Sequence, residues 1–292
     1  MRFSHALSGL SCVAAASAIA CNGYSELCAR KYSNITQIGT HDSAFVGWLP
    51  TENQADSVTA QLDAGIRFLQ AQTHEDNSVL TMCHTSCTEL NAGPLSDYLT
   101  TVKTWLDANP NEVLTLLLTN GDYVDVTLFG DVMVSTGLSS YAYTPSGQLT
   151  IDEWPTLQTM IDSGERLVVF LDYDGDTSKV PYILPEFSYF WETAYDVTDS
   201  SFSSCALDRP SGSTGAGLMY IVNHFLDLSV LGIKFPDTLA LSTTNAATGS
   251  GSITAQTDLC ESTWSGQKPK AVLVDYFEEG DVFTAQSLLN GL

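Results

Sequence analysis

Two histidines stand directly after short apolar segments, in Gly39-Thr40-His41-Asp42-Ser43 and in Met82-Cys83-His84-Thr85-Ser86. Histidine changes its charge near neutral pH and can therefore exchange protons with a bound substrate. A single histidine at the end of a strand is more often a packed, hydrogen-bonded residue. His41 and His84 are therefore candidates for catalysis, with a structural role as the alternative.

Further polar residues follow other apolar segments. Asp172 and Asp174 lie two residues apart, and on a strand such residues face the same way at less than about 7 Å, so they could form the carboxylate pair of a glycosidase. A solvated acidic rim is the simpler interpretation of these two aspartates. His224 is expected to satisfy nearby backbone groups. The remaining candidates are Gln70, Gln72, His74, Asn120, Asp122, Asn223 and Asp275.

Short apolar segments alternate with stretches of helical spacing, which predicts a parallel α/β barrel. One helix is expected over 94–108, where Leu95, Leu99, Val102 and Leu106 recur at helical spacing. Several connections are too short for a full helix, so the prediction is a single domain with a distorted TIM (β/α)8-type barrel. In such a barrel the residues just beyond the strands gather at one end. The expected strands are 35–40, 66–72, 79–82, 113–119, 167–172, 218–223, 239–242 and 271–276.

Two other segments have distinctive compositions. Residues 242–256 are rich in Ser, Thr, Gly, Ala and Asn and are expected to form a long surface loop. The aromatic segment 187–191 is expected to belong to the core or to a lid, with a lipid-binding patch as the weaker alternative.

The 292-residue chain is strongly acidic, with 11 Lys+Arg against 34 Asp+Glu and a formal charge of -23. Its field repels nucleic acid and anionic membrane surfaces, which excludes a nucleic-acid-binding role. Residues 1–20 resemble a signal peptide, with Arg2, an apolar run and Ala18-Ile19-Ala20 as the cleavage motif. No later segment has the roughly 20 apolar residues of a transmembrane helix. We expect a secreted, extracellular monomer with one domain over 21–292 and no transmembrane segment.

Removal of residues 1–20 deletes Cys12 and leaves six of the seven cysteines. An even number of cysteines in an oxidising compartment predicts disulfides, and short loops close at little entropic cost. A zinc site built from Cys83, His84 and Cys87 is the weaker alternative, because no second pair stands at ligand spacing. Asn34-Ile35-Thr36 is the only N-glycosylation sequon. The expected disulfides are Cys21–Cys28, Cys83–Cys87 and Cys205–Cys260.

Five motifs follow one another along the chain: Ile38-Gly39-Thr40-His41-Asp42-Ser43, Gly65-Ile66-Arg67-Phe68-Leu69-Gln70, Cys83-His84-Thr85-Ser86, Asn109-Pro110-Asn111-Glu112-Val113 and Val272-Leu273-Val274-Asp275-Tyr276. Each motif alone is weak, but their order and spacing are specific. Over residues 30–290 the chain resembles the catalytic domain of the phosphatidylinositol-specific phospholipases C. It is most similar to the secreted, fungal-type branch of these PLC-like phosphodiesterases.

The resemblance implies a phosphoric diester hydrolase that acts on a phosphodiester or phospholipid. His41 would match the general base that takes a proton from the attacking oxygen, and His84 the general acid that protonates the leaving alkoxide. Asp275 would match the carboxylate that fixes the tautomer of the base histidine and favours its charged form. In the family's usual reaction the inositol 2-hydroxyl attacks phosphorus and gives a cyclic phosphodiester and diacylglycerol.

The second predicted strand departs from the family. Bacterial members carry Asp-x-Arg there and calcium-dependent members carry Glu-x-Asp, whereas this chain has Gln70-Ala71-Gln72. The arginine that cancels phosphate charge and two of the calcium-holding carboxylates are therefore missing. We expect no cofactor, with weakly bound Ca²⁺ or Mg²⁺ at Asp42 as the alternative, because Asp42 matches a ligand position of the metal-dependent members. Asp42, Gln70, Gln72 and His74 are expected to contact the substrate, without the inositol selectivity of the bacterial enzymes.

Two arginines are candidates for the missing cation. Arg67 lies three residues before Gln70, so strand alternation points it to the opposite face and predicts a structural role. Arg209, in Leu207-Asp208-Arg209-Pro210, is the better candidate cation for the substrate phosphate, although a surface salt bridge is its simpler interpretation.

Two classes of function are compatible with this sequence. The retained His41, His84 and Asp275 favour a phosphodiesterase. The uncharged Gln70 and Gln72 favour a catalytically weak barrel that binds a sugar or lipid headgroup, since a fold does not determine a function.

Overall fold

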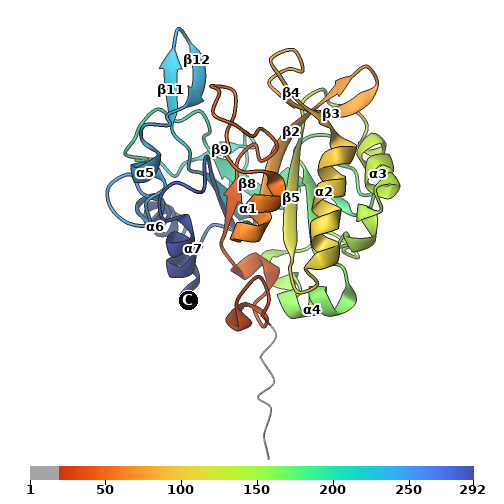
Figure 1. Cartoon of the computed structure of the whole chain (residues 1–292). Helices are drawn as coiled ribbons and strands as arrows, with labels where there is room; N and C mark the ends of the chain where they lie inside the picture. The colour runs from red at the N-terminus through yellow and green to blue at the C-terminus, as the bar shows by residue number, and fades with distance from the viewer. Residues whose placement is uncertain (1–19) are drawn as a thin grey trace, which may run out of the picture.

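The computed structural model describes residues 20–292, so the predicted signal peptide lies outside the described residues except for Ala20. Eight parallel strands form a curled sheet, namely β1 (Gln37–Thr40), β2 (Phe68–Asp76), β5 (Leu114–Asn120), β6 (Leu167–Leu171), β7 (Ile183–Pro185), β8 (Phe190–Thr193), β10 (Met219–Asn223) and β13 (Ala271–Val274). Their order is β7-β6-β5-β2-β1-β13-β10-β8 (Figure 1). Within residues 20–292 no strand pairing joins β7 to β8, so the barrel is open there. The predicted α/β class and distorted TIM-type barrel are confirmed.

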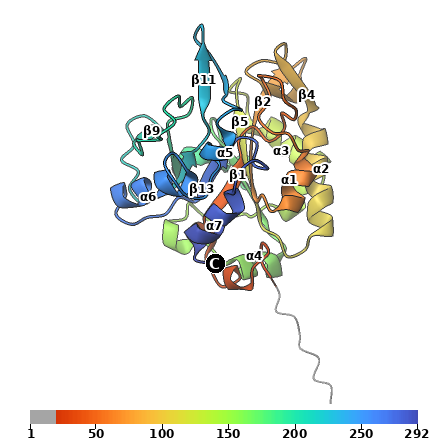
Figure 2. The ribbon, with the colours of Figure 1, turned by 60° about the vertical axis from the view of Figure 1, so that its left-hand side comes forward.

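The other strands extend this sheet or stand apart from it. β3 (Val79–His84) and β4 (Leu90–Pro94) continue antiparallel from β2, and β9 (Leu207–Arg209) pairs antiparallel with β8. β11 (Asp227–Val230) and β12 (Ile233–Pro236) form a separate hairpin. Figures 1 and 2 show that the β3–β4 and β11–β12 hairpins project from the same end of the barrel. This end is the mouth, where the parallel strands finish, because β3 follows β2 and β11 follows β10.

Helices cover the outside of the sheet. They are α1 (Val58–Ala64), α2 (Leu95–Ala108), α3 (Val126–Ser135), α4 (Leu157–Ser163), α5 (Leu241–Thr244), α6 (Ile253–Thr263) and α7 (Val282–Asn290). α2 confirms the helix predicted over 94–108, and its periodic side chains Leu95, Leu99, Val102 and Leu106 are buried. β5 and β6 are apolar along nearly their whole length because a parallel strand beneath helices is buried on both faces.

Three sequence assignments need correction, and a fourth is confirmed. Segment 79–82 is a strand, but it belongs to the β3–β4 hairpin and not to the barrel. Segment 239–242 is no strand: it contains a turn and the start of α5, and Leu239 is 92% exposed. Segment 242–256 is not one loop, because it ends α5 and begins α6. Segment 187–191 contributes to the core, as expected, because it contains the beginning of β8, whose aromatic side chains Phe190 and Trp191 are buried.

The three expected disulfides are present, and each one closes a different part of the structure. Cys21–Cys28 closes a short loop within the N-terminal segment, and Cys83–Cys87 closes the loop after β3. Cys205–Cys260 links the segment before β9 to α6. The pairings predicted from loop length are confirmed. None of the helices described over residues 20–292 is long and apolar enough to cross a membrane.

Candidate active site

His41 follows β1 at the mouth of the barrel and is held from two sides. Its Nδ1 lies 2.9 Å from Oδ1 of Asp275, the residue that follows β13. Phe225 stacks on the imidazole with ring centroids 3.8 Å apart. Asn53 donates hydrogen bonds of 3.2 and 3.3 Å to the two carboxylate oxygens of Asp275, which fixes the orientation of this carboxylate. The contact requires the Nδ1–H tautomer of a neutral His41 and leaves Nε2 for other partners.

Asp42 brings the two histidines together. Its Oδ2 lies 3.4 Å from Nε2 of His41 and 3.3 Å from Nε2 of His84. The Asp42 side chain is fully buried, whereas those of His41 and His84 are 17% and 20% exposed. A substrate can therefore reach the two imidazoles but not the carboxylate beneath them.

The residues that directly follow His41, His84 and Asp275 each have a positive φ angle. These residues are Asp42 (47°), Thr85 (59°) and Tyr276 (45°). Residues other than glycine adopt this conformation at a cost of order 1–3 kcal/mol, and it persists only where the surroundings enforce it. The chain turns sharply after each of the three side chains, so that all three stay directed into the mouth.

Gln70 and Gln72 connect the Asp42 turn to the His84 loop. Oε1 of Gln70 accepts the backbone N–H of Asp42 at 2.8 Å. Nε2 of Gln72 donates to Oδ2 of Asp42 at 2.9 Å, while its Oε1 accepts the backbone N–H of Thr85 at 3.2 Å. Gln70 therefore positions Asp42, Gln72 joins Asp42 to the His84 loop, and the contact of both glutamines with substrate stays a prediction.

Electrostatics around His41 favour its charged form. Burial alone would lower the pKa of His41, but Asp42 and Asp275 raise it to about 9, with a smaller contribution from Asp227. Burial would raise the pKa of Asp42, but the two histidines hold it below its ordinary value. Burial raises the pKa of Asp275, and the contact with His41 opposes this shift. His41 is therefore an imidazolium at neutral pH in the free protein.

Three further candidates have partners outside this group. His74 lies on β2 and pairs with Asp122, with Nδ1 and Oδ1 3.0 Å apart. Arg67 pairs with Glu112 at 2.7 Å and stacks on Trp105, so its predicted structural role is confirmed. His224 is buried, and its Nε2 lies 2.8 Å from the backbone oxygen of Thr244. The expected contact of His224 with nearby backbone groups is therefore present.

Arg209 lies in a buried acidic cluster. Its side chain, which is 30% exposed, forms an ion pair with the buried carboxylate of Glu192, so Arg209 makes the expected salt bridge, but with a buried partner. Asp172 and Glu186 are the other buried carboxylates near Arg209. Burial raises the pKa of Asp172 to about 6 and that of Glu186 well above its ordinary value. The positive charge of Arg209 is thus already offset within the protein.

The carboxylate pair expected for a glycosidase is not formed. β6 ends at Leu171, and Asp174 lies beyond it in a turn with φ of 58°. Oδ1 of Asp172 accepts the backbone N–H groups of Asn120 and Tyr173, whereas Asp174 is exposed. The two aspartates do not share one face of a strand, because β6 ends before both of them and the backbone turns at Asp174.

Sequence reasoning missed several residues of the site. Asn53 and Phe225 hold Asp275 and His41, and Asp227 raises the pKa of His41. Asn53 lies in a loop and gives no local signal. Phe225 and Asp227 follow β10 and could have been found by extending the search beyond each strand end. Within residues 20–292 no group of three or more His, Cys, Asp or Glu side chains has an arrangement suited to a metal ion.

The sequence is similar to known proteins over most of its length. Residues 27–290 match the family model described as PI-PLC X 1. The "PI-PLC X domain-containing protein 1" of Arthroderma benhamiae is 51% identical over 274 residues, which cover 93% of this chain and 90% of the relative. An "Uncharacterized secreted protein" of the same organism is 44% identical over 286 residues, which cover 93% of this chain and 64% of the relative.

Solved structures share the fold at low sequence identity. A mutant of the phosphatidylinositol-specific phospholipase C from Staphylococcus aureus has a TM-score of 0.60 and 13% identity, covering 90% of this chain and 94% of that one. The phosphatidylinositol-specific phospholipase C from Listeria monocytogenes has a TM-score of 0.54 and 15% identity, covering 91% of this chain and 95% of that one. Identities this low show a common fold alone.

We expect the substitution Asp275→Asn to lower the pKa of His41 from about 9 toward its ordinary value, because it removes the negative charge beside Nδ1. NMR titration of the His41 imidazole measures this change. Asp227→Asn is the matched control, since Asp227 is also buried but contributes less to the pKa of His41. An unchanged pKa in Asp275→Asn, or a larger drop in the control, would contradict this account.

Proposed function

Because the chain belongs to the PI-PLC X family, we propose that it is a phosphodiesterase in which His41 and His84 act as an acid–base pair. The observation that carries this proposal is the position of the two imidazoles on either side of Asp42, with Asp275 behind His41. A packed structural histidine needs no such arrangement. Two partly exposed imidazoles whose Nε2 atoms contact one oxygen are suited to act on two oxygens of one phosphodiester.

The proposed reaction is a displacement at phosphorus. His41 takes the proton of the attacking hydroxyl as its oxygen forms the new P–O bond, and His84 gives a proton to the leaving oxygen as the old P–O bond breaks. Asp275 then stabilises the imidazolium formed at His41. The pKa of about 9 means that the neutral, basic form of His41 becomes more abundant as the pH rises toward that value.

A charged His41 can also replace the missing arginine. Gln70 and Gln72 carry no charge, and the charge of Arg209 is offset by Glu192. Below pH 9 a charged His41 can attract the phosphodiester anion, since Asp42 and Asp275 maintain its protonated form. Binding and proton abstraction then require different protonation states of the same residue.

A metal-independent reaction fits the atoms around Asp42. Its Oδ2 is approached by Nε2 of His41, Nε2 of His84 and Nε2 of Gln72. Ca²⁺ and Mg²⁺ prefer shells of oxygen ligands, whereas N–H donors favour a carboxylate that stays an anion without a cation. The donor set therefore does not fit the calcium site that other branches of the family would suggest.

Exposed apolar side chains beside the site favour a lipid substrate. Leu231 and Ile233 of the β11–β12 hairpin are 98% and 65% exposed, and Trp48 in the loop after β1 is 58% exposed. Trp48 stacks on Tyr276, next to Asp275, and the hairpin begins two residues after Phe225. Exposed apolar side chains beside the mouth of the barrel can enter a lipid surface while the polar site faces the headgroups.

The protein is further proposed to be exported. Its three disulfides suit an oxidising compartment, and one relative is named a secreted protein. The signal peptide predicted at residues 1–20 is consistent with this location.

We expect His41→Ala and His84→Ala each to lower kcat/KM by about 10²- to 10⁴-fold, the usual contribution of general acid or base catalysis. Turnover of bis(4-nitrophenyl) phosphate and of a panel of phospholipids measures the effect. His74→Ala is the matched histidine control, because its imidazole pairs with Asp122 outside the His41–Asp42–His84 group. Retention of more than about a tenth of the rate in either variant would refute the pair. No turnover by the wild type would favour a headgroup-binding barrel.

A chelator is expected to leave the rate of the wild-type protein unchanged, because three nitrogen atoms contact Oδ2 of Asp42. The assay compares protein dialysed against EDTA with the same protein after addition of Ca²⁺ or Mg²⁺. Activity that is lost on dialysis and restored by either cation would show that the metal-independent mechanism is wrong.

Replacing Leu231 and Ile233 together by serine should weaken binding to phosphatidylcholine vesicles by at least tenfold, because each side chain contributes about 1.5–3 kcal/mol when buried. Hydrolysis of a soluble phosphodiester should not change. Val134 and Leu288, 63% and 53% exposed on α3 and α7, give the matched double serine control. Equal vesicle binding by both double variants would exclude the hairpin as the lipid-contacting element.

A further inference from the structure

The sequon Asn34-Ile35-Thr36 lies at the end of the barrel opposite the mouth. Asn34 is the last residue of the short 3-10 helix η2 (Tyr32–Asn34), just before β1 begins. Asn34 is exposed, and its carboxamide has no hydrogen-bond partner among residues 20–292. Figure 1 shows this N-terminal segment below the barrel, beside α4 and away from both hairpins.

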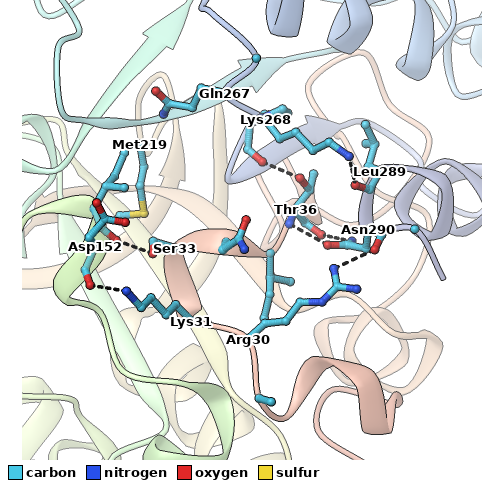
Figure 3. A pocket seen from close by; sticks show the side chains of 17 residues that line it. Arg30, Lys31, Ser33, Thr36, Asp152, Met219, Gln267, Lys268, Leu289 and Asn290 are labelled. Atoms are coloured by element: carbon cyan, nitrogen blue, oxygen red, sulfur yellow. Dashed lines mark hydrogen bonds between the residues drawn. The ribbon is translucent and has the colours of Figure 1, made fainter.

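Asn34 lines a cavity of about 710 Å³ at this end of the barrel. Cavities of this size hold small-molecule ligands in many proteins. Figure 3 shows three cationic side chains around it, each directed at a backbone oxygen: Lys31 at Asp152, Arg30 at Asn290 and Lys268 at Leu289. Each ammonium or guanidinium group has further N–H donors beyond this one bond. The cavity can therefore donate hydrogen bonds to a ligand rich in oxygen.

We propose that Asn34 carries an N-linked glycan whose first sugar residues lie in this cavity. In the modification, Nδ2 of Asn34 forms a bond to the anomeric carbon of a sugar supplied by a lipid-linked oligosaccharide diphosphate. The bond from that carbon to the diphosphate oxygen breaks, the lipid diphosphate leaves, and the amide loses one proton. The sugar hydroxyl and acetamide oxygens would then accept hydrogen bonds from Arg30, Lys31 and Lys268.

The fold requires that this modification occur before the C-terminal segment docks against Thr36. Thr36 is buried, and its hydroxyl donates to the backbone oxygen of Pro269 at 2.6 Å. Its backbone N–H and C=O are both bound by the side chain of Asn290. These partners lie 233 and 254 residues later in the chain, so the sequon stays extended and accessible until the C-terminal segment docks. Modification during synthesis therefore meets no steric barrier.

This inference depends on export and is independent of the phosphodiesterase activity. His41 and His84 lie at the mouth, whereas Asn34 precedes the opposite end of β1. Loss of the glycan should leave turnover at the mouth unchanged. Failure of the catalytic proposal and failure of the glycan proposal are therefore separate results.

The test expresses the full-length precursor in a eukaryotic secretory host and measures the mass of the tryptic peptide 32–67. We expect the wild-type and Thr36→Ser proteins to carry the glycan, because serine keeps the hydroxyl of the sequon. Asn34→Gln and Thr36→Val should lack it, and Asn34→Gln should fold normally because Asn34 is exposed. Enzymatic release should convert Asn34 to aspartate. An unmodified 32–67 peptide in the wild-type protein would overturn the proposal.

A second measurement tests whether the sugars lie in the cavity. An endoglycosidase should release the glycan readily from denatured protein and much more slowly from folded protein. Replacing both Lys31 and Lys268 by methionine should speed release from the folded protein, because the side-chain donors are lost. Equal release rates from the folded and denatured wild-type protein would show that the glycan extends freely into solvent.

Discussion

The site depends on the parallel pairing of β1 with β13, which joins the two ends of the chain. Thr40 pairs with Val274, and the backbone N–H of His41 donates to the oxygen of Val274 at 3.0 Å. This register sets His41 beside Asp275 although 234 residues separate them in sequence. Because side chains alternate along a strand, a shift of one residue would direct Asp275 away from His41. The contact between His41 and Asp275 therefore exists only in the folded protein.

Gly39 makes this pairing possible at its most crowded point. A Cβ atom at Gly39 would lie 2.7 Å from Cδ2 of Leu273 and 3.0 Å from the backbone oxygen of Phe68. β1 lies between β13 and β2, and a side chain at this position would separate both neighbours. The glycine two residues before His41 therefore serves packing, and through packing it sets the distance between His41 and Asp275.

The sequence predicted the strands that contain long apolar runs. It missed short strands that are recognised only by their pairing with neighbouring strands. β5 and β6 could be recognised because parallel strands buried on both faces are apolar throughout. β7 has three residues and β8 has four, which are too few to show the alternation of a strand. The aromatic residues of β8 indicated burial in the core but did not indicate a strand. At the site, His41, His84 and Asp275 were found by motif. The supporting contacts of Asn53 come from a loop whose position is set by tertiary packing alone.

Charge distribution explains why histidine carries so much of the proposed chemistry. Near the mouth, the described lysine and arginine side chains are engaged: Arg209 pairs with Glu192, and Lys234 donates to the backbone oxygen of Asp196. An ordinary histidine, with a pKa of about 6.5, would be mostly neutral at pH 7 and could not replace an arginine. The carboxylates that surround His41 remove this difficulty by raising its pKa to about 9. The acidic surroundings that would repel a phosphodiester thus also maintain the cation that can attract it.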